Sequence, residues 1–142
     1  MGKPNVAVLS GFGINCETET ITAFEMAGAT AKRTHVNRLV DGELKLSDFD
    51  ILAVPGGFSF GDHLGSGRLL GNRLRFSLRE EVRAFVASKK PVIGICNGFQ
   101  VLVKMGLLPG DEDLSMSQTA SLTANDCGRY EDRWVTLEFD RN

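Results

Sequence analysis

The sequence predicts a flavodoxin-like α/β fold of three layers (α/β/α), in which helices cover both faces of a mostly parallel sheet. Short apolar runs alternate with amphipathic segments along most of the chain. Such runs are typical of buried parallel strands, which need helical crossovers between them. A chain of 142 residues is long enough to bury one core without disulfides or metals, so we expect a single domain.

The first strand, the first helix and the second strand follow from the pattern of the first 36 residues. An apolar, β-branched run over 5–10 ends in a glycine turn, as a buried strand does. A helix is expected over 16–27, because apolar residues recur on one face, Asn15 can cap its beginning and Gly28 can end it. A weaker and more polar strand is expected over 30–36.

The middle of the chain combines a polar connection, a buried strand and a glycine-rich segment. Residues 37–50 are expected to form the polar connection, with one short turn. Residues 51–54 are fully apolar and stop at Pro55, as a buried strand would. The segment 56–71 contains six glycines, which no regular element tolerates easily.

One helix, one strand and a second helix are expected next. Apolar side chains recur every three or four residues over 70–88, which indicates a single amphipathic helix. Pro91 separates this helix from the apolar strand 92–95, and residues 97–105 have the mixed apolar character of a buried helix. The local plan is therefore a strand, a sharp turn and a helix.

The last part of the chain has a different character. Residues 111–113 are acidic and are expected to form a solvated loop, whereas residues 134–139 alternate between polar and apolar side chains. Alternation with a period of two predicts a one-sided, antiparallel strand.

Composition excludes several classes of function. Sixteen Lys and Arg stand against eighteen Asp and Glu, which gives a net charge of −2 without the basic clusters that nucleic-acid binding needs. No apolar run is long enough to cross a membrane, and no signal peptide is recognisable. Cys16, Cys96 and Cys127 form no metal-binding or disulfide pattern, so we expect reduced thiols, no metal site and a cytoplasmic location.

The sharpest motif is Gly94-Ile95-Cys96-Asn97-Gly98, between an expected strand and an expected helix. Glycines on both sides of a nucleophile allow a strained turn that lifts its side chain out at the carboxyl edge of the sheet. A thiol at a helix N-terminus has a larger thiolate fraction, and the N–H of Asn97 can point at a developing oxyanion. Cys96 is therefore the candidate nucleophile, and the alternative is a small, inert residue buried at a tight turn.

A second motif, Pro55-Gly56-Gly57-Phe58-Ser59-Phe60-Gly61-Asp62, follows another apolar strand. If the two strands are neighbours, this loop faces Cys96 across the same edge of the sheet. The N–H groups of Gly57 and Phe58 are then candidates for completing an oxyanion hole. Without that neighbour, an ordinary surface turn is the alternative interpretation.

Together, the two motifs resemble those of the class I (triad) glutamine amidotransferases, in particular the amidotransferase subunit or domain of phosphoribosylformylglycinamidine synthase. Gly13-Ile14-Asn15-Cys16-Glu17 with Glu19, and Gly106-Leu107-Leu108-Pro109-Gly110, also fit this family. The resemblance covers residues 6–139, so residues 1–142 are expected to be an amidotransferase domain. It implies a glutaminase component of a C–N ligase in de novo purine synthesis.

The resemblance also implies roles for individual residues. Cys96 would attack the side-chain amide of glutamine, form a γ-glutamyl thioester and release ammonia. The residues implied to contact glutamine are Gly56, Gly57, Phe58, Ser59 and Gln100, and those implied to stabilise the oxyanion are Gly57, Phe58 and Asn97. The ammonia would pass to a formylglycinamidine ribonucleotide synthetase subunit or domain that uses ATP and Mg, and no cofactor is expected in this chain. Cys16 matches the family pattern without an evident chemical role.

The histidines depart from the family pattern. Family members carry the triad histidine and glutamate in a His-Gly-Glu context well after the cysteine, but no histidine follows Cys96 here. His63 precedes Cys96 in the glycine-rich loop and could approach it, whereas His35 is expected to be structural or exposed. The simplest interpretation is that the chain is the first part of a longer subunit, with the sheet incomplete at its C-terminal end and the triad base absent.

Two alternatives stay open. The chain could be a non-catalytic, truncated amidotransferase-like module that docks to a synthetase, with Cys96 as a relic. It could also be a thiol protein of the PfpI/DJ-1 type, which shares the cysteine turn, although Phe58-Ser59 and the run 97–100 argue against this. Protection of the Cys96 thiol by glutamine, or a preference for aldehydes or peroxides, distinguishes these classes.

Overall fold

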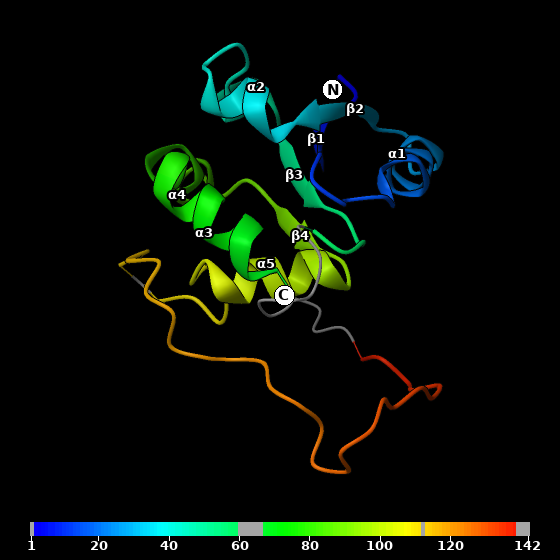
Figure 1. Ribbon diagram of the computed structural model, residues 1–142. Helices are drawn as coiled ribbons and strands as arrows, with labels where there is room; N and C mark the ends of the chain where they lie inside the picture. Colours follow the sequence, from blue (N-terminus) through cyan, green and yellow to red (C-terminus); the bar gives the residue numbers. More distant parts are fainter. Residues whose placement is uncertain (1, 60–66, 112, 139–142) are drawn as a thin grey trace.

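The computed structural model describes residues 2–59, 67–111 and 113–138, and a parallel sheet forms its centre (Figure 1). The strands of the described residues are β1 (Asn5–Ser10), β2 (Thr30–His35), β3 (Ile51–Val54) and β4 (Val92–Gly94). They lie in the order β2-β1-β3-β4, and every neighbouring pair is parallel. The four expected parallel strands are confirmed, and the second and fourth end one residue earlier than expected.

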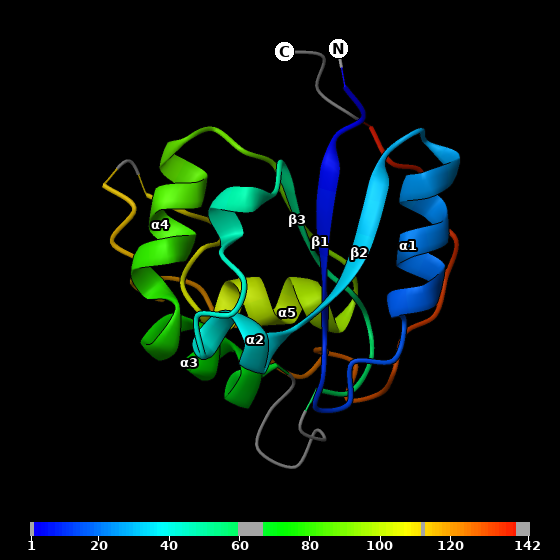
Figure 2. The same ribbon diagram turned by 90° about the horizontal axis from the view of Figure 1, so that it is seen from above.

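Helices cover both faces of this sheet, as the sequence predicts. They are α1 (Glu17–Met26), α2 (Val36–Val40), α3 (Arg68–Ser77), α4 (Arg79–Ala87) and α5 (Asn97–Lys104), with a 3₁₀ turn, η1, at Leu46–Asp48. Figure 2 shows α1 on one side of β1 and β2, and α3 and α4 on the other. Alternate residues of β1 therefore enter different cores: Val6 and Val8 pack in the core beside α1, whereas Ala7 and Leu9 belong to the larger core under the other helices. The result is the three-layer, flavodoxin-like arrangement.

Helix α1 begins differently from the expectation. Cys16, not Asn15, is its N-cap, and no side chain caps the first turn. The N–H groups of Asn15 and Cys16 both point at the carbonyl oxygen of Gly56, at 3.4 Å, so the start of the helix is tied to the loop after β3. The expected end is confirmed, because Gly28 follows the C-cap and its N–H donates to the carbonyl oxygen of Glu25 at 2.9 Å.

The single helix expected over 70–88 is two helices that meet at Leu78. The backbone of Leu78 has φ −127° and ψ 17°, which ends α3 and begins α4. Leu74, Leu78 and Val82 are all buried, so the four-residue apolar spacing continues across the break. A break that keeps the same spacing leaves no trace in the hydrophobic pattern, which explains why the sequence does not reveal it.

The connection over 37–50 contains more regular structure than expected. Helix α2 begins after His35, whose Nδ1 accepts a hydrogen bond from the N–H of Asn37 at 3.2 Å. Leu39 and Leu46 are buried in the larger core, and this burial holds the helix and the following 3₁₀ turn against the sheet. Tertiary packing here overrides the polar local composition.

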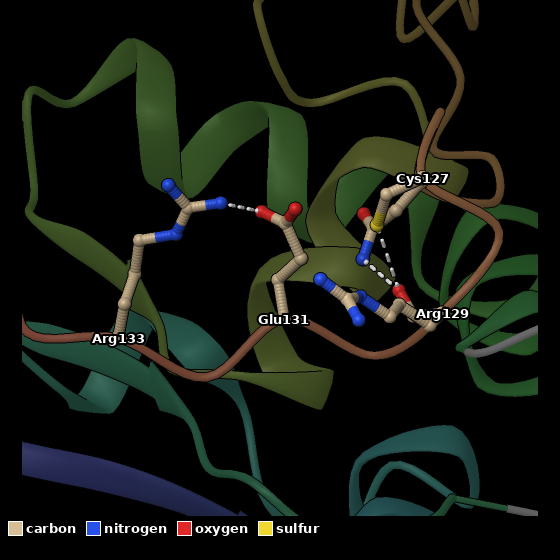
Figure 3. A network of polar contacts seen from close by, with 5 residues as sticks. Cys127, Arg129, Glu131 and Arg133 are labelled. Atoms are coloured by element: carbon tan, nitrogen blue, oxygen red, sulfur yellow. Dashed lines mark hydrogen bonds and ion pairs between the residues drawn. The ribbon is translucent and has the colours of Figure 1, made fainter.

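The antiparallel strand expected over 134–139 is wrong within the described residues, because residues 131–138 contain no strand. Trp134 is fully exposed, and Val135 and Leu137 are exposed as well, so this segment lacks the buried face that a one-sided strand requires. Its polar contacts are local. Figure 3 shows Cys127 Sγ donating to the carbonyl oxygen of Arg129, and Arg133 paired with Glu131.

No helix among the described residues is long and apolar enough to span a membrane.

Candidate active site at the carboxyl edge of β3 and β4

Cys96 sits at the sharp turn between β4 and α5, as the motif predicts. Its backbone has φ 52° and ψ −114°, a conformation that residues with a side chain rarely adopt. The side chain is exposed, and Cys96 is the N-cap of α5. The turn therefore presents the thiol outward at the carboxyl edge of the sheet, next to the positive end of a helix dipole.

The two glycines that flank this turn are required by close packing. A Cβ on Gly98 would stand 1.8 Å from the carbonyl oxygen of Val54, and a Cβ on Gly94 would stand 2.7 Å from the carbonyl oxygen of Gly98. These contacts are with backbone atoms, which cannot move aside without disturbing β3 or the turn. The glycine spacing of the motif thus reflects how closely α5 approaches the neighbouring strand.

The loop after β3 lies beside Cys96, as expected for neighbouring strands. Val54 of β3 pairs with Gly94 of β4, and the N–H of Ile95 donates to the carbonyl oxygen of Val54 at 3.1 Å. The position of a Cβ on Gly56 would be 3.5 Å from the Cβ of Cys96 and 3.5 Å from the Sγ of Cys16. The structure thus brings together three segments: the nucleophile turn, the glycine loop and the start of α1.

The N–H groups of Gly57 and Phe58, expected to complete an oxyanion hole, differ in their hydrogen bonding. The N–H of Phe58 donates to the carbonyl oxygen of Gly13 at 2.8 Å, because Ile14 and Gly57 form an antiparallel bridge. The N–H of Phe58 is therefore already bonded within the chain in this structure. The N–H of Gly57 makes no hydrogen bond with another described residue, and neither does the N–H of Asn97. Gly57 and Asn97 are the donors that this geometry leaves for an oxyanion.

Asn97 joins the glycine loop to the nucleophile turn through its side chain. Its Oδ1 accepts hydrogen bonds from the N–H of Ser59 at 3.1 Å and from the hydroxyl of Ser59 at 2.7 Å. Its Nδ2 donates to Oε1 of Gln100 at 3.0 Å. Ser59 and Asn97 are 1% and 3% exposed, so their polar groups face each other and not the solvent.

An open cavity of about 390 Å³ lies beside Cys96. Its lining residues come from three segments: Asn15, Cys16, Glu19, Thr20 and Ala23 at the start of α1, Gly56, Gly57 and Phe58 after β3, and Ile95 and Cys96 after β4. Of the residues implied to contact glutamine, Gly56, Gly57 and Phe58 therefore line the cavity. Ser59 and Gln100 are not lining residues, and both are bonded to Asn97.

The wall formed by α1 was not part of the predicted site. Its sequence signal was the segment Asn15-Cys16-Glu17 with Glu19, which fits the family pattern but suggested no role from spacing alone. The hydrogen bonds from Asn15 and Cys16 to Gly56 hold the start of α1 at the site, and they join parts of the chain about 40 residues apart.

Neither histidine is shown beside the thiol. His35 lies at the end of β2, which β1 and β3 separate from β4 in the sheet, and its Nδ1 accepts a hydrogen bond from the N–H of Asn37. His63 lies outside the described residues. Within the part of the chain that the structure describes, no group of three or more His, Cys, Asp or Glu side chains is arranged to hold a metal ion.

Comparisons with known proteins agree with this geometry. A family model described as a CobB/CobQ-like glutamine amidotransferase domain matches residues 3–142. Among curated proteins, phosphoribosylformylglycinamidine synthase subunit PurQ of Methanococcus maripaludis is 45% identical over 135 residues, which is 95% of this chain and 50% of the relative. The PurQ subunit of Dehalococcoides mccartyi is 45% identical over 137 residues, which is 96% of this chain and 53% of the relative.

A solved structure, PurLQS from Thermotoga maritima, matches with a TM-score of 0.69 and 30% sequence identity. The match covers 90% of this chain and 51% of that chain. The chain thus spans about half the length of the curated relatives it matches.

Proposed function

The chain belongs to the CobB/CobQ-like glutamine amidotransferase domain family, and from this premise we propose that it carries the nucleophile of a glutaminase that supplies ammonia for purine synthesis. The observation that carries the proposal is the strained turn that presents the Cys96 thiol at a cavity that Gly57 also lines, with the unbonded N–H of Asn97 next to Cys96 in the chain. A nucleophile with two neighbouring backbone donors is the arrangement that acyl transfer needs.

The chemistry assigned to this site is hydrolysis of the glutamine side-chain amide. The Cys96 thiolate attacks the amide carbon, and the resulting oxyanion is stabilised by the N–H groups of Gly57 and Asn97. The C–N bond then breaks, the nitrogen takes up a proton and leaves as ammonia, and a γ-glutamyl thioester remains on Cys96. Water hydrolyses the thioester to glutamate and restores the thiol.

The residues around Cys96 divide into those that touch glutamine and those that position others. Gly56, Gly57 and Phe58 border the cavity, so we propose that they contact the substrate. Ser59 is buried on Asn97, which supports a positioning role for its hydroxyl in place of the substrate contact expected from the sequence. Gln100 is half-buried and accepts a hydrogen bond from Asn97, so a contact with glutamine requires its amide group to turn toward the cavity.

Deprotonation of Cys96 requires a base, and the one described histidine does not lie beside the thiol. His35 lies at the end of β2 and caps α2 with its Nδ1. No histidine follows Cys96 in the sequence. We propose that the base is either His63 or a residue that does not belong to these 142.

The proposed partner is a synthetase that consumes the ammonia. The curated relatives are named as subunits of phosphoribosylformylglycinamidine synthase, and the similar solved structure is titled PurLQS. By this likeness, the partner is a formylglycinamidine ribonucleotide synthetase, and ATP and Mg act on that partner. The described cysteines form no disulfide, which is compatible with the reducing cytoplasm, where we place the protein.

The comparisons favour this function over a thiol protein of the PfpI/DJ-1 type. The relatives from Methanococcus maripaludis and Dehalococcoides mccartyi carry the PurQ name, which gives no support to a thiol protein of the PfpI/DJ-1 type. A docking module that has lost catalysis would have the same fold and the same relatives. Only the reactivity of Cys96 toward glutamine distinguishes such a module from a glutaminase.

The test uses an electrophilic analogue of glutamine with a chloroketone in place of the side-chain amide. We expect it to alkylate Cys96, as mapped by peptide mass spectrometry, and we expect an excess of glutamine to slow the reaction. The Cys96→Ser variant should take up no label at this position. Equal labelling of Cys96 and the exposed Cys127, unaffected by glutamine, would contradict the proposal.

A further inference from the structure

The cavity beside Cys96 has one wall that the proposed chemistry leaves without a role. Four residues of this wall, Cys16, Glu19, Thr20 and Ala23, belong to the start of α1. They are spaced three, one and three residues apart, so they share one face of the helix, and that face looks into the cavity. The first turn of α1 is thus part of the same site as the nucleophile.

Among the described residues that line this cavity, Glu19 is the only one with a charged side chain. Its carboxylate takes part in none of the hydrogen bonds or ion pairs between described residues. The other polar groups of the same face are already used: the hydroxyl of Thr20 donates to the carbonyl oxygen of Cys16 at 2.7 Å, and the thiol of Cys16 points at Oδ1 of Asn15 at 3.5 Å. The wall therefore offers a single uncompensated negative charge.

The position of this charge relative to the thiol fits a small amino acid. The Sγ of Cys16 and the Cβ of Cys96 both lie 3.5 Å from the place where a Cβ on Gly56 would stand. Glu19 follows Cys16 by three residues, and side chains at this spacing are neighbours, with about 5–6 Å between their Cβ atoms. The carboxylate and the nucleophile thus border one cavity from different walls.

We infer that Glu19 binds the α-ammonium group of glutamine while the side-chain amide reaches Cys96. This inference rests on the proposed function and names a residue that gives the site its preference for a free amino acid. An ammonium group is the cation that the substrate presents, and a hydrogen bond between two charged groups is stronger than one between neutral groups. Glu19 acts on binding and orientation, not on the bond-breaking step.

The test compares two alkylating reagents in the intact chain and in two variants. One reagent is the chloroketone analogue of glutamine, and the other is the same chloroketone without the α-amino group. Glu19→Gln removes the charge and keeps the shape of the side chain. Glu17→Gln is the matched control, because Glu17 lies in the same turn of α1 and does not line the cavity. Iodoacetamide reports the intrinsic reactivity of the Cys96 thiol in each protein.

In Glu19→Gln, we expect the glutamine analogue to label Cys96 at least about tenfold more slowly than in the unsubstituted chain. The rates for iodoacetamide and for the analogue without the amino group should be unchanged. Glu17→Gln should behave as the unsubstituted chain. If Glu19→Gln kept its full rate with the glutamine analogue, Glu19 would have no such role, although glutamine would still protect Cys96. If the unsubstituted chain did not distinguish the two chloroketones and glutamine gave no protection, both this inference and the proposed function would be overturned.

Discussion

The carboxamide oxygen of Asn97 accepts hydrogen bonds from both the N–H and the hydroxyl of Ser59, at 3.1 and 2.7 Å. The two residues are 38 positions apart in the chain, and the pair is buried. It connects the loop after β3 to the first turn of α5, and so it ties the loop that carries Gly57 to the turn that carries Cys96. A substitution in this pair should therefore affect both stability and the reactivity of the site.

Asn97→Ala should destabilise the fold by about 1–3 kcal/mol, because it leaves the buried N–H and hydroxyl of Ser59 without an acceptor. Ser59→Ala should cost less, about 1 kcal/mol, since the N–H of residue 59 keeps its bond. Urea unfolding at equilibrium measures both values. Two variants with the stability of the unsubstituted chain would show that the pair does not form in solution.

Gly98→Ala should abolish the native fold or lower its stability by more than about 3 kcal/mol, because the added methyl group would meet the backbone of Val54 at 1.8 Å. Gly28→Ala is the control for backbone conformation alone. Gly28 has φ 91°, and a Cβ at this position would have nothing within 4 Å, so Gly28→Ala should lower the free energy of unfolding by about 1 kcal/mol. Thermal unfolding followed by circular dichroism compares the two, and equal losses would contradict the close packing of α5 on β3.

Cys96→Gly should be more stable than Cys96→Ala by about 1 kcal/mol. Glycine relieves the strain of φ 52° and ψ −114°, and its larger conformational entropy in the unfolded chain offsets part of that gain. The comparison is made by urea unfolding of the two variants, neither of which has a thiol at this position. An alanine variant as stable as the glycine variant would indicate that the turn is relaxed.

The 142-residue chain should release no ammonia from glutamine above the level of the Cys96→Ser variant, because no described histidine lies beside the thiol to activate it. Ammonia release is measured with a coupled glutamate dehydrogenase assay. Rapid release by the unsubstituted chain that is lost in His63→Gln would place the base at His63. Release that persists in His63→Gln would exclude His63 and show that another group of this chain is the base.

The nucleophile turn could be predicted from sequence because its requirements are local. Gly94, Cys96 and Gly98 lie within five residues, and the need for glycine comes from the path of the chain between one strand and the next helix. The position of the glycine loop beside Cys96 could also be predicted from the sequence, because β3 and β4 are neighbours and parallel strands present their carboxyl ends at one edge of the sheet.

Other features depend on contacts between distant segments, and the sequence pattern does not contain them. The bridge between Ile14 and Gly57 uses the N–H of Phe58, so the number of free donors in the loop could not be read from its glycines. The same bridge brings the start of α1 to the thiol. The break at Leu78 was hidden because the apolar spacing continues through it. The alternation around Trp134 suggested a strand, but a period of two has meaning only where one face is buried.

The most direct test of the account is the rate at which iodoacetamide alkylates each cysteine of the intact chain, with and without glutamine. Cys16 and Cys96 line the proposed glutamine cavity, whereas Cys127 is exposed in the segment after α5. We predict that glutamine slows the alkylation of Cys96 and Cys16, that asparagine at the same concentration does so much less, and that Cys127 reacts at one rate throughout. Unchanged rates at Cys96 and Cys16 in saturating glutamine would contradict the assignment of this site to glutamine.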